Sequence, residues 1–321
     1  MLSGALFRPM TTPTLETRGL TRRFGELVAV DALSIRVHPG EIYGFLGPNG
    51  AGKTTSIRMM AGLLRPTAGS VHVLGQEVAP SAPDARRLVG LCPQENVVYP
   101  ELTARENLEY AAALYDVPRA KRRERALTVL RELGLEEKAE ARASALSGGM
   151  KRRLTMGLAI VHEPPVVVLD EPEAGLDPQT RVQVRSFIQT LRERHTVVLT
   201  SHNMDEVERL ADRVAIVDQG RLVAEGTPHE LKAKLGSGDL LEVTLADERA
   251  ESVVAALRPH VAGDVAASGR VVSVRGLDLA RQFPTLLATV QDAGAAVVDV
   301  RYRGNTLEDV FIALTGRGLR E

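Results

Sequence analysis

The stretch E-I-Y-G-F-L-G-P-N-G-A-G-K-T-T, residues 41–55, restricts the fold of this chain more than any other segment. An apolar run at residues 42–46 predicts a buried strand, and good helix formers follow from Lys53 onward. The glycine-rich turn between them matches G-x-x-x-x-G-K-[ST], the phosphate-loop pattern. With average residue usage, this pattern arises by chance in roughly 1% of chains of this length. Strand, turn and helix in this order predict an α/β fold that binds a nucleotide.

The residue types in this turn suit a phosphate group. Glycines allow consecutive backbone N–H groups to curl around an anionic oxygen where a Cβ atom would collide, and the following helix presents its positive end. The ammonium group of Lys53 adds a full charge beside the β- and γ-phosphates, and the hydroxyl of Thr54 can bind Mg²⁺. We therefore expect nucleotide contacts along the whole turn, from Gly47, Pro48, Asn49, Gly50, Ala51, Gly52, Lys53, Thr54 and Thr55.

Composition limits the classes of protein to consider. A length of 321 residues predicts two domains, and a formal net charge of −1 gives no support for a nucleic-acid partner. The single cysteine, Cys92, excludes an internal disulfide and fits a reducing cytoplasm. No apolar run approaches the ~20 residues that cross a bilayer, and the first ten residues lack the apolar segment of a secretory signal. We expect a soluble, cytoplasmic chain.

The pattern of apolar residues changes along the chain. Residues 1–13 show no periodicity and predict a loose tail, and alternating segments from Leu15 predict antiparallel strands. Residues 103–161 have a helical pattern rich in Ala, Leu, Glu and Arg. A hairpin is expected about Gln219–Gly220, and a boundary at residues 236–238. Beyond this boundary, strand-like and helix-like segments alternate without a catalytic cluster, which predicts a small α+β domain.

Two carboxylates follow the apolar run at residues 166–170, which predicts a buried strand of a parallel sheet. In phosphate-loop NTPases, a carboxylate at the end of such a strand holds Mg²⁺, the position of Asp170 here. Glu171 comes directly after it and can polarise an attacking water. An isolated Asp-Glu pair is usually a solvated turn. Its place after a buried strand, downstream of Lys53, favours the functional interpretation.

Three further polar residues stand at the ends of expected elements. Ser147, in A-L-S-G-G-M-K-R-R, predicts the cap of a helix whose bare N–H groups can meet an anion. Asp177 precedes Pro178 and predicts a second capped helix. His202 follows the apolar strand at residues 196–200, at the sheet edge where ligands bind in open α/β proteins. Taken alone, Ser147 would be an ordinary helix start and His202 a structural histidine.

Together these segments resemble the nucleotide-binding subunit of ATP-binding cassette (ABC) transporters, over about residues 15–235. The resemblance implies an α/β fold: a phosphate-loop ABC ATPase core with an antiparallel β subdomain and an α-helical subdomain at about residues 95–162. The expected domains are therefore a tail, an ATPase domain at residues 14–235, and a C-terminal accessory α+β domain at residues 239–321. The implied ligands are ATP and Mg²⁺.

The resemblance also assigns individual residues. Gln94 matches the glutamine of the family's Q-loop, His202 its switch histidine, and Asp177 the aspartate of its D-loop. Phe24 matches the aromatic residue that stacks on adenine, with a packed core residue as the alternative. The family's signature L-S-G-G-Q is L-S-G-G-M here, with Met150 in place of glutamine. We expect this departure to be tolerated, because the phosphate contacts come chiefly from the backbone and serine of Ser147, Gly148 and Gly149.

In this family, two cassettes pair head to tail, and each ATP lies between one subunit's phosphate loop and the other's signature. The implied partners are a second copy of the chain and a separate integral-membrane permease, which would dock near residues 94–100. The chain would then be peripheral on the cytoplasmic face of the membrane. The implied Mg²⁺ ligands are Thr54, Gln94 and Asp170. The implied catalytic residues are Lys53, Gln94, the general base Glu171, and His202, which steadies the γ-phosphate.

Glu173 is a second departure, since the family usually has threonine, serine or an apolar residue there. We expect a solvent-facing carboxylate; the alternative is that its charge raises the pKa of Glu171 by like-charge repulsion. The basic run at residues 119–125 is expected to be a solvated helix face rather than a lipid contact.

The C-terminal N-T-L-E-D-V-F-I-A-L-T-G, residues 305–316, predicts an amphipathic helix with Leu307, Val310, Phe311 and Leu314 in its apolar stripe. This segment and the S-G-G-M-K-R-R form resemble the exporter branch for drugs, antibiotics and polysaccharides, such as the daunorubicin-resistance ATPases. The resemblance therefore implies export of a drug, lipid, polysaccharide or similar cargo. The alternatives are an importer subunit, or a non-transport cytosolic ATPase such as an iron–sulfur assembly factor.

Overall fold

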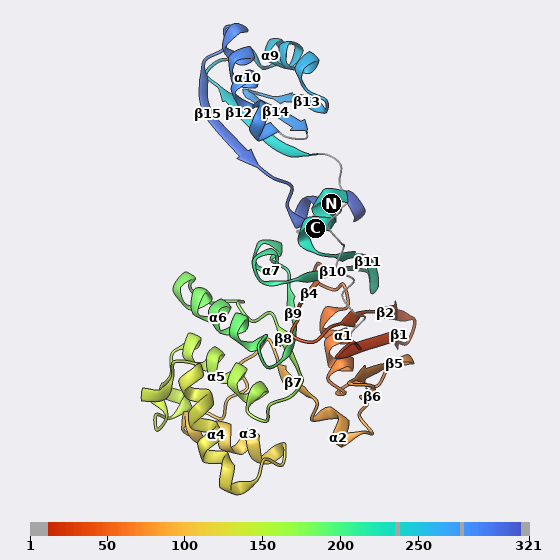
Figure 1. The fold of residues 1–321 in the computed structure, drawn as a ribbon, viewed down its shortest axis with the longest axis vertical. Helices are drawn as coiled ribbons and strands as arrows, with labels where there is room; N and C mark the ends of the chain where they lie inside the picture. Colours follow the sequence, from red (N-terminus) through yellow and green to blue (C-terminus); the bar gives the residue numbers. More distant parts are fainter. Residues whose placement is uncertain (1–11, 235–237, 277–278, 316–321) are drawn as a thin grey trace, which may run out of the picture. The chain divides into compact units, whose positions relative to one another are not determined.

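The computed structural model describes residues 12–234, 238–276 and 279–315, which form two compact units that divide between Thr227 and Pro228 (Figure 1). The ATPase domain expected at residues 14–235 extends past this division, because residues 228–234 belong to the second unit. Most of the expected tail and two of the three residues at the expected boundary lie outside the described residues.

A six-stranded sheet forms the centre of the first unit. Five of its strands are parallel and buried, as their continuous apolar sequences predict, and the hairpin partner β11 is antiparallel at one edge. In sheet order the strands are β11 (Arg221–Gly226), β10 (Arg213–Asp218), β4 (Ile42–Leu46), β9 (Thr196–Ser201), β8 (Val166–Asp170) and β7 (Val89–Cys92). The expected hairpin about Gln219–Gly220 is confirmed by the pairing of Asp218 with Arg221.

A second, antiparallel sheet follows from the alternating segments near the N-terminus. Its strands are β2 (Leu27–Leu33), β1 (Leu15–Phe24), β5 (Ala68–Val73) and β6 (Gln76–Glu77), with β3 (Arg36–Val37) paired to β1. Its apolar side chains share one buried cluster with α1 (Lys53–Met60) and one face of the central sheet, including Leu15, Phe45 and Ile57. This shared core fixes the start of α1 against both sheets.

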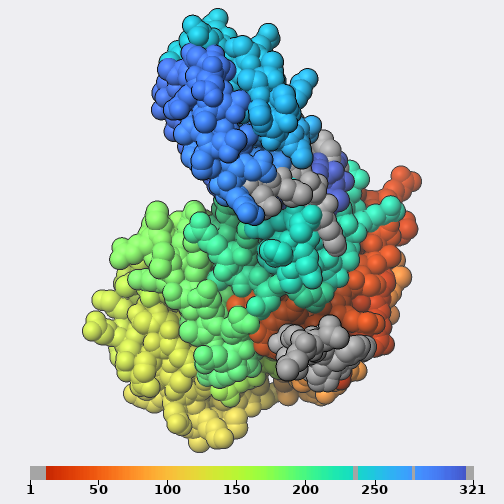
Figure 2. Space-filling view, turned by 45° about the horizontal axis from the view of Figure 1, so that its top comes forward, coloured from red at the N-terminus to blue at the C-terminus, as the bar shows by residue number. Residues whose placement is uncertain are grey.

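The helical segment lies on the opposite flank of the first unit from the antiparallel sheet (Figure 2). It contains α3 (Ala104–Leu114), α4 (Arg119–Glu132) and α5 (Gly148–Ile160), with 3₁₀ turns at Glu136–Lys138 and Ala143–Ala145. The other helices of this unit are α2 (Pro83–Arg86), α6 (Pro178–Leu191) and α7 (Met204–Leu210). We expected the basic run in α4 to be a solvated helix face, but this does not hold for all of it. Arg125 is largely buried and donates to the carbonyl oxygens of Ile160 and Val161 at the end of α5.

The second unit begins with α8 (Pro228–Lys234) and contains a four-stranded antiparallel sheet. The sheet order is β13 (Asp264–Ser268), β14 (Val271–Gly276), β12 (Asp239–Leu245) and β15 (Val297–Arg303), with a 3₁₀ turn at Arg258–His260. The helices α9 (Ala250–Leu257) and α10 (Leu279–Asp292) contact each other and cover one face of this sheet. This connection order, strand–helix–strand twice, is the ferredoxin-like split β-α-β arrangement.

The sequence predicts most elements of this unit but misses β13, whose D-V-A-A-S offers only one β-branched residue. The C-terminal helix α11 (Leu307–Thr315) buries Leu307, Val310 and Phe311 as predicted, whereas Leu314 is 49% exposed and does not belong to the buried stripe. Throughout the described part of the chain, every helix is too short or too polar to cross a membrane.

Candidate functional site

The phosphate loop leads from β4 into α1 and requires glycine at specific positions. Gly50 and Gly52 have φ angles of 80° and 93°, in the left-handed region. A Cβ atom on Gly52 would lie 2.3 Å from the carbonyl oxygen of Ala29, and one on Gly47 would lie 2.3 Å from that of Val217. Gly52 also caps α1 without any side-chain hydrogen bond. The first N–H groups of this helix therefore have no side-chain cap and can bind an anion.

Lys53 is only 6% exposed. Its Nζ atom donates hydrogen bonds to the carbonyl oxygens of Gly47 and Pro48, at 2.7 and 2.9 Å. Burial lowers the pKa of Lys53, while the negative charges of Glu171 and Asp170 oppose that shift. The ammonium group is thus fixed to its own loop, where the carboxylates of Glu171 and Asp170 act on its charge.

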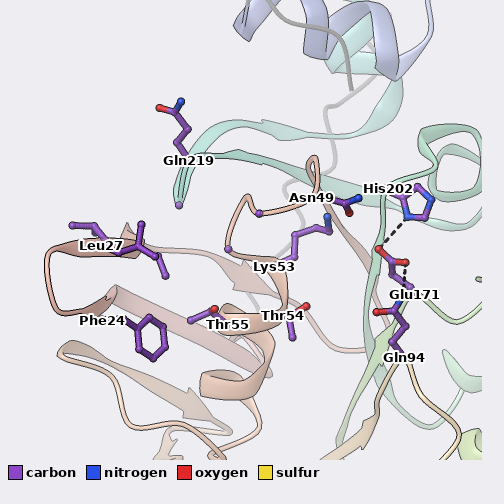
Figure 3. Close-up of a pocket in the computed structure, with 15 residues that line it drawn as sticks. Phe24, Leu27, Asn49, Lys53, Thr54, Thr55, Gln94, Glu171, His202 and Gln219 are labelled. Carbon is purple, nitrogen blue, oxygen red and sulfur yellow. Dashed lines mark hydrogen bonds and ion pairs between the residues drawn. The ribbon is translucent and has the colours of Figure 1, made fainter. Parts of the chain in front are cut away.

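A cavity of about 840 Å³ opens over this loop (Figure 3). The phosphate loop forms its floor, the hairpin between β10 and β11 and the β1–β2 turn form one side, and the ends of β7, β8 and β9 form the other. The cavity is lined by Phe24, Leu27, Val28, Ala29, Asn49, Gly50, Gly52, Lys53, Thr54, Thr55, Gln94, Glu171, His202, Gln219 and Gly220.

Three predicted site residues converge at the side of the cavity formed by the ends of β7, β8 and β9. Gln94 donates from Nε2 to Oε2 of Glu171 at 3.2 Å, and Nδ1 of His202 lies 3.0 Å from the other carboxylate oxygen (Figure 3). Glu171 has a φ angle of 45°, which is unusual for a residue other than glycine. Its N–H group donates to the carbonyl oxygen and hydroxyl of Thr200, at 3.1 and 3.0 Å. Strained backbone of this kind is typical of functional sites.

Asp170 does not line the cavity but lies directly behind it. It pairs with Thr200 in the β8–β9 register and accepts a 2.6 Å hydrogen bond from the Thr200 hydroxyl. Burial raises the pKa of Asp170, while that hydrogen bond lowers it.

The site offers oxygen donors that suit Mg²⁺. Within the described residues there is no cluster of three or more His, Cys, Asp or Glu side chains that could hold a metal. A magnesium ion, however, prefers one or two carboxylates completed by phosphate oxygens and water. Of the expected ligands, Thr54 and Gln94 line the cavity and offer a hydroxyl and an amide oxygen, whereas the Asp170 carboxylate lies outside its lining.

The Ser147 and Asp177 segments lie outside this cavity. Ser147 caps α5 by accepting from the N–H group of Met150 at 3.3 Å, and Asp177 caps α6 by accepting from that of Thr180 at 3.0 Å, so both predicted caps are confirmed. The two helix starts are neighbours, because a Cβ atom on Gly149 would lie 2.7 Å from the side chain of Thr180. Ser147, Gly148 and Asp177 are exposed, and none of them lines the cavity over the chain's own phosphate loop. Together with Gly149 they form one accessible region, which we call the Ser147 surface.

Comparison with known proteins shows the family of this chain. The sequence pattern of the family described as "ABC transporter" matches residues 30–174. The Nod factor export ATP-binding protein I of Ralstonia nicotianae is 39% identical over 312 residues, covering 97% of this chain and 96% of that protein. This chain belongs to the ABC transporter family.

Other members of the family match over similar lengths. The daunorubicin resistance ATP-binding protein DrrA3 of Streptomyces coeruleorubidus is 37% identical over 96% of this chain and 97% of that protein. The linearmycin resistance ATP-binding protein LnrL of Bacillus subtilis is 35% identical over 96% of this chain and all of that protein. A solved ATP-binding subunit of an ABC transporter is 30% identical, with a TM-score of 0.63, and covers 70% of this chain and 93% of that structure. The chain is accordingly an ABC ATPase subunit with an α/β phosphate-loop fold.

Some residues around the nucleotide cavity of this ABC ATPase were missed by sequence reasoning. Leu27, Val28 and Ala29 line it from β2, and Gln219 and Gly220 line it from the hairpin turn. The hairpin is attached to the phosphate loop, since the N–H group of Gly220 donates to Ala51 at 3.1 Å. The turn itself is visible in the sequence, but nothing local to it indicates which loop it meets.

Two expectations about single residues are decided by burial. Phe24 is 45% exposed and lines the cavity, so the alternative of a packed core residue is wrong. The Arg22 guanidinium lies 4.5 Å from the centre of the Phe24 ring and occupies one of its faces. We expected Glu173 to face solvent, and this expectation is wrong. Glu173 is 3% exposed and accepts two 2.9 Å hydrogen bonds from Nε of Arg185. A buried carboxylate is stable there because a guanidinium matches its charge.

Proposed function

We propose that this chain is the ATP-hydrolysing subunit of an ABC exporter that works through a separate membrane permease. The curated relatives named above are export or resistance proteins, and they match the second unit as well as the ATPase unit, because they cover 96–97% of this chain. The convergence of Gln94, Glu171 and His202 beside the phosphate loop supports hydrolysis at that cavity.

In the proposed mechanism, Glu171 accepts a proton from the attacking water. The hydrogen bonds from Gln94 and His202 orient its carboxylate toward the cavity. Lys53 and the bare N–H groups of α1 stabilise negative charge on the β- and γ-phosphates, and Phe24 supports the adenine. The Mg²⁺ that accompanies ATP would be held by Thr54, Gln94 and Asp170, where it would neutralise charge on the phosphates. Catalysis then depends mainly on positioning and charge stabilisation.

The functional form we propose is a head-to-tail pair of chains. The Ser147 surface carries a helix start with exposed N–H groups, yet none of its residues lines the cavity of its own chain. A second copy that presents Ser147, Gly148 and Gly149 to the γ-phosphate would use these groups, and Asp177 would lie at the same contact. Two identical contacts related by a two-fold axis close the pair.

As the permease contact we propose a groove of about 240 Å³, which replaces the site expected near residues 94–100, because none of those residues lines it. It lies between the end of α1, α2, β7 and the end of α3. Leu63 and Leu114 line it and are 57% and 63% exposed, and Arg87 lies at its rim, paired with Asp116. An apolar floor with a charged rim suits a short cytoplasmic helix of an integral-membrane protein. This groove would place the ATPase at the cytoplasmic face of the membrane.

The variant Glu171→Gln tests the hydrolytic role. Loss of a general base costs about 10²- to 10⁴-fold in turnover, whereas the phosphate loop and the Ser147 surface remain intact. We expect this variant to bind ATP, to dimerise in its presence, and to hydrolyse it at least a hundredfold more slowly than wild type. Turnover equal to wild type would refute the assignment of Glu171.

The same variant tests the partner. In detergent-solubilised membranes with ATP, Glu171→Gln should retain an integral-membrane protein of about six spans, because blocked hydrolysis prolongs the ATP-bound state. Leu114→Asp in the proposed groove should abolish this retention while ATP-dependent dimerisation persists. If a substrate-binding lipoprotein were recovered with the complex, import would replace export, and a complex without any membrane protein would favour a cytosolic ATPase.

A further inference from the structure

Arg152, in α5, has an unusual set of partners. It is 2% exposed, and each of its five N–H donors meets a different backbone carbonyl oxygen. Nε donates to Pro172 at 3.0 Å. One terminal nitrogen donates to Pro93 and Gln94 at 2.6 and 2.8 Å, and the other donates to Asp170 and Glu171 at 2.8 and 3.0 Å. Among the described residues no carboxylate accepts a hydrogen bond from it, and its charge is compensated by these carbonyl dipoles together with the nearby Asp170 carboxylate, on which the guanidinium acts electrostatically.

These five carbonyl groups belong to two segments that the sheet no longer connects. The parallel pairing of β7 with β8 ends at Cys92 and Leu169. Beyond that point, Gln94 and Glu171 diverge from the sheet toward the nucleotide cavity. Beyond the last β7–β8 hydrogen bonds, the side chain of Arg152 connects the two segments instead. It also joins both of them to α5, the helix that begins at Ser147.

The backbone at Glu171 explains why such a connection is needed. A residue other than glycine keeps a φ angle of 45° only where its surroundings determine that conformation. Arg152 bonds three successive carbonyl groups, those of residues 170–172, while Thr200 accepts from the N–H group of Glu171. Together they hold the strained residue on both sides, and the direction of the Glu171 carboxylate follows from them.

We propose that Arg152 is a positioning residue for hydrolysis: it sets Gln94 and Glu171 relative to each other and connects both to the Ser147 helix. This inference rests on the proposed catalytic role of Glu171. Lysine cannot replace Arg152, because an ammonium group has three donors on one atom and cannot reach five separate carbonyl groups. A buried arginine with only a structural role would lower stability when replaced, without acting through Gln94.

A double-mutant cycle separates these two roles. In the full-length chain, Arg152→Lys should lower kcat at least tenfold and leave the KM for ATP within threefold of wild type. In a Gln94→Ala background, the same substitution should lower kcat threefold or less, because the interaction between Gln94 and Glu171 is already absent. The matched control is Arg153→Lys on the same helix, since Arg153 donates one hydrogen bond to Leu133 at 2.8 Å and contacts neither segment. It should leave kcat within twofold in both backgrounds.

Thermal melting curves show whether each variant is folded. If Arg152→Lys does not fold, Arg152→Gln, which leaves no buried charge, replaces it in the same cycle. The inference is overturned if the Arg152 substitution lowers kcat by the same factor with and without Gln94, or if Arg153→Lys lowers it equally. Glu171→Gln, measured in parallel, keeps the two questions apart. Full turnover in that variant would remove the proposed function itself, whereas its inactivity combined with an unaffected Arg152→Lys would remove only the role of Arg152.

Discussion

Glu173 and Arg185 form an ion pair, and removing Arg185 should destabilise the fold more than removing Glu173. The Glu173 side chain is 2% exposed and that of Arg185 is 23% exposed, and a third contact joins them at 2.7 Å. Removing Arg185 leaves a carboxylate buried without its partner, which typically costs about 3–5 kcal/mol. Removing Glu173 leaves a guanidinium that is partly solvated and lies 3.9 Å from Glu206. We estimate about 1–2 kcal/mol for that change, between the values for exposed and buried pairs.

Thermal unfolding of the full chain measures this difference. A change of 1 kcal/mol shifts the melting temperature of a unit of this size by roughly 2–4 °C, so Arg185→Leu should lower that of the ATPase unit by about 6–20 °C and Glu173→Thr by about 2–8 °C. The matched control is Arg194→Leu, because Arg194 pairs with Glu132 at 2.8 Å with both side chains partly exposed. It should cost less than about 1 kcal/mol.

The double variant Glu173→Thr/Arg185→Leu should be more stable than Arg185→Leu alone, because it contains no buried unpaired charge. A double variant no more stable than Arg185→Leu, or an Arg185→Leu no worse than Arg194→Leu, would refute this reasoning. The pH–rate profile of Glu173→Thr should superimpose on wild type, because Arg185 already matches the Glu173 charge.

Two further predictions follow from single side chains. Phe24→Ala should raise the KM for ATP roughly 5- to 100-fold, the range expected for loss of one base-stacking contact. The kcat should change little, because the ring is remote from Glu171 in the cavity (Figure 3). Unchanged ATP affinity would contradict the stacking role. Burial lowers the pKa of His162, which stacks on Tyr115, to about 4. An unfolded histidine titrates near pH 6.5, so the stability due to the neutral ring should be complete above that pH and decrease by about 2–3 kcal/mol as the pH falls to 4. Urea titrations of wild type and His162→Gln across this range should show a shallower pH dependence in the variant.

The features that the sequence predicts well are those determined within a few residues. The phosphate loop needs glycine because neighbouring backbone would collide with a Cβ atom, so its conformation can be predicted from its sequence. The caps at Ser147 and Asp177 and the turn at Gln219 depend on local hydrogen bonds and backbone angles. Apolar runs predict which strands are buried, and that places His202 and Glu171 at one edge of the sheet.

The features that it does not predict depend on partners distant in the chain. Carboxylates are usually exposed, so Glu173 alone favours a solvated position, and its partner Arg185, about two turns into α6, becomes visible only when α6 is placed. Arg152 is harder still to recognise, because all five of its acceptors are backbone carbonyl groups. Every residue has such a group, so the sequence contains no trace of the pairing.

These two arginines act on the same short segment, which carries both Glu171 and Asp177. Arg152 attaches its beginning to α5, and Arg185 attaches its middle to α6 through Glu173. Both helices begin at the exposed surface where a second copy would contact the γ-phosphate. Because each attachment is a multiple, directional hydrogen bond to a buried group, a displacement of either helix start must move the segment or break these bonds. The proposed general base, Glu171, is therefore linked by hydrogen bonds to the two helices that begin at the proposed dimer contact, and hydrolysis would depend on dimerisation if both proposals hold.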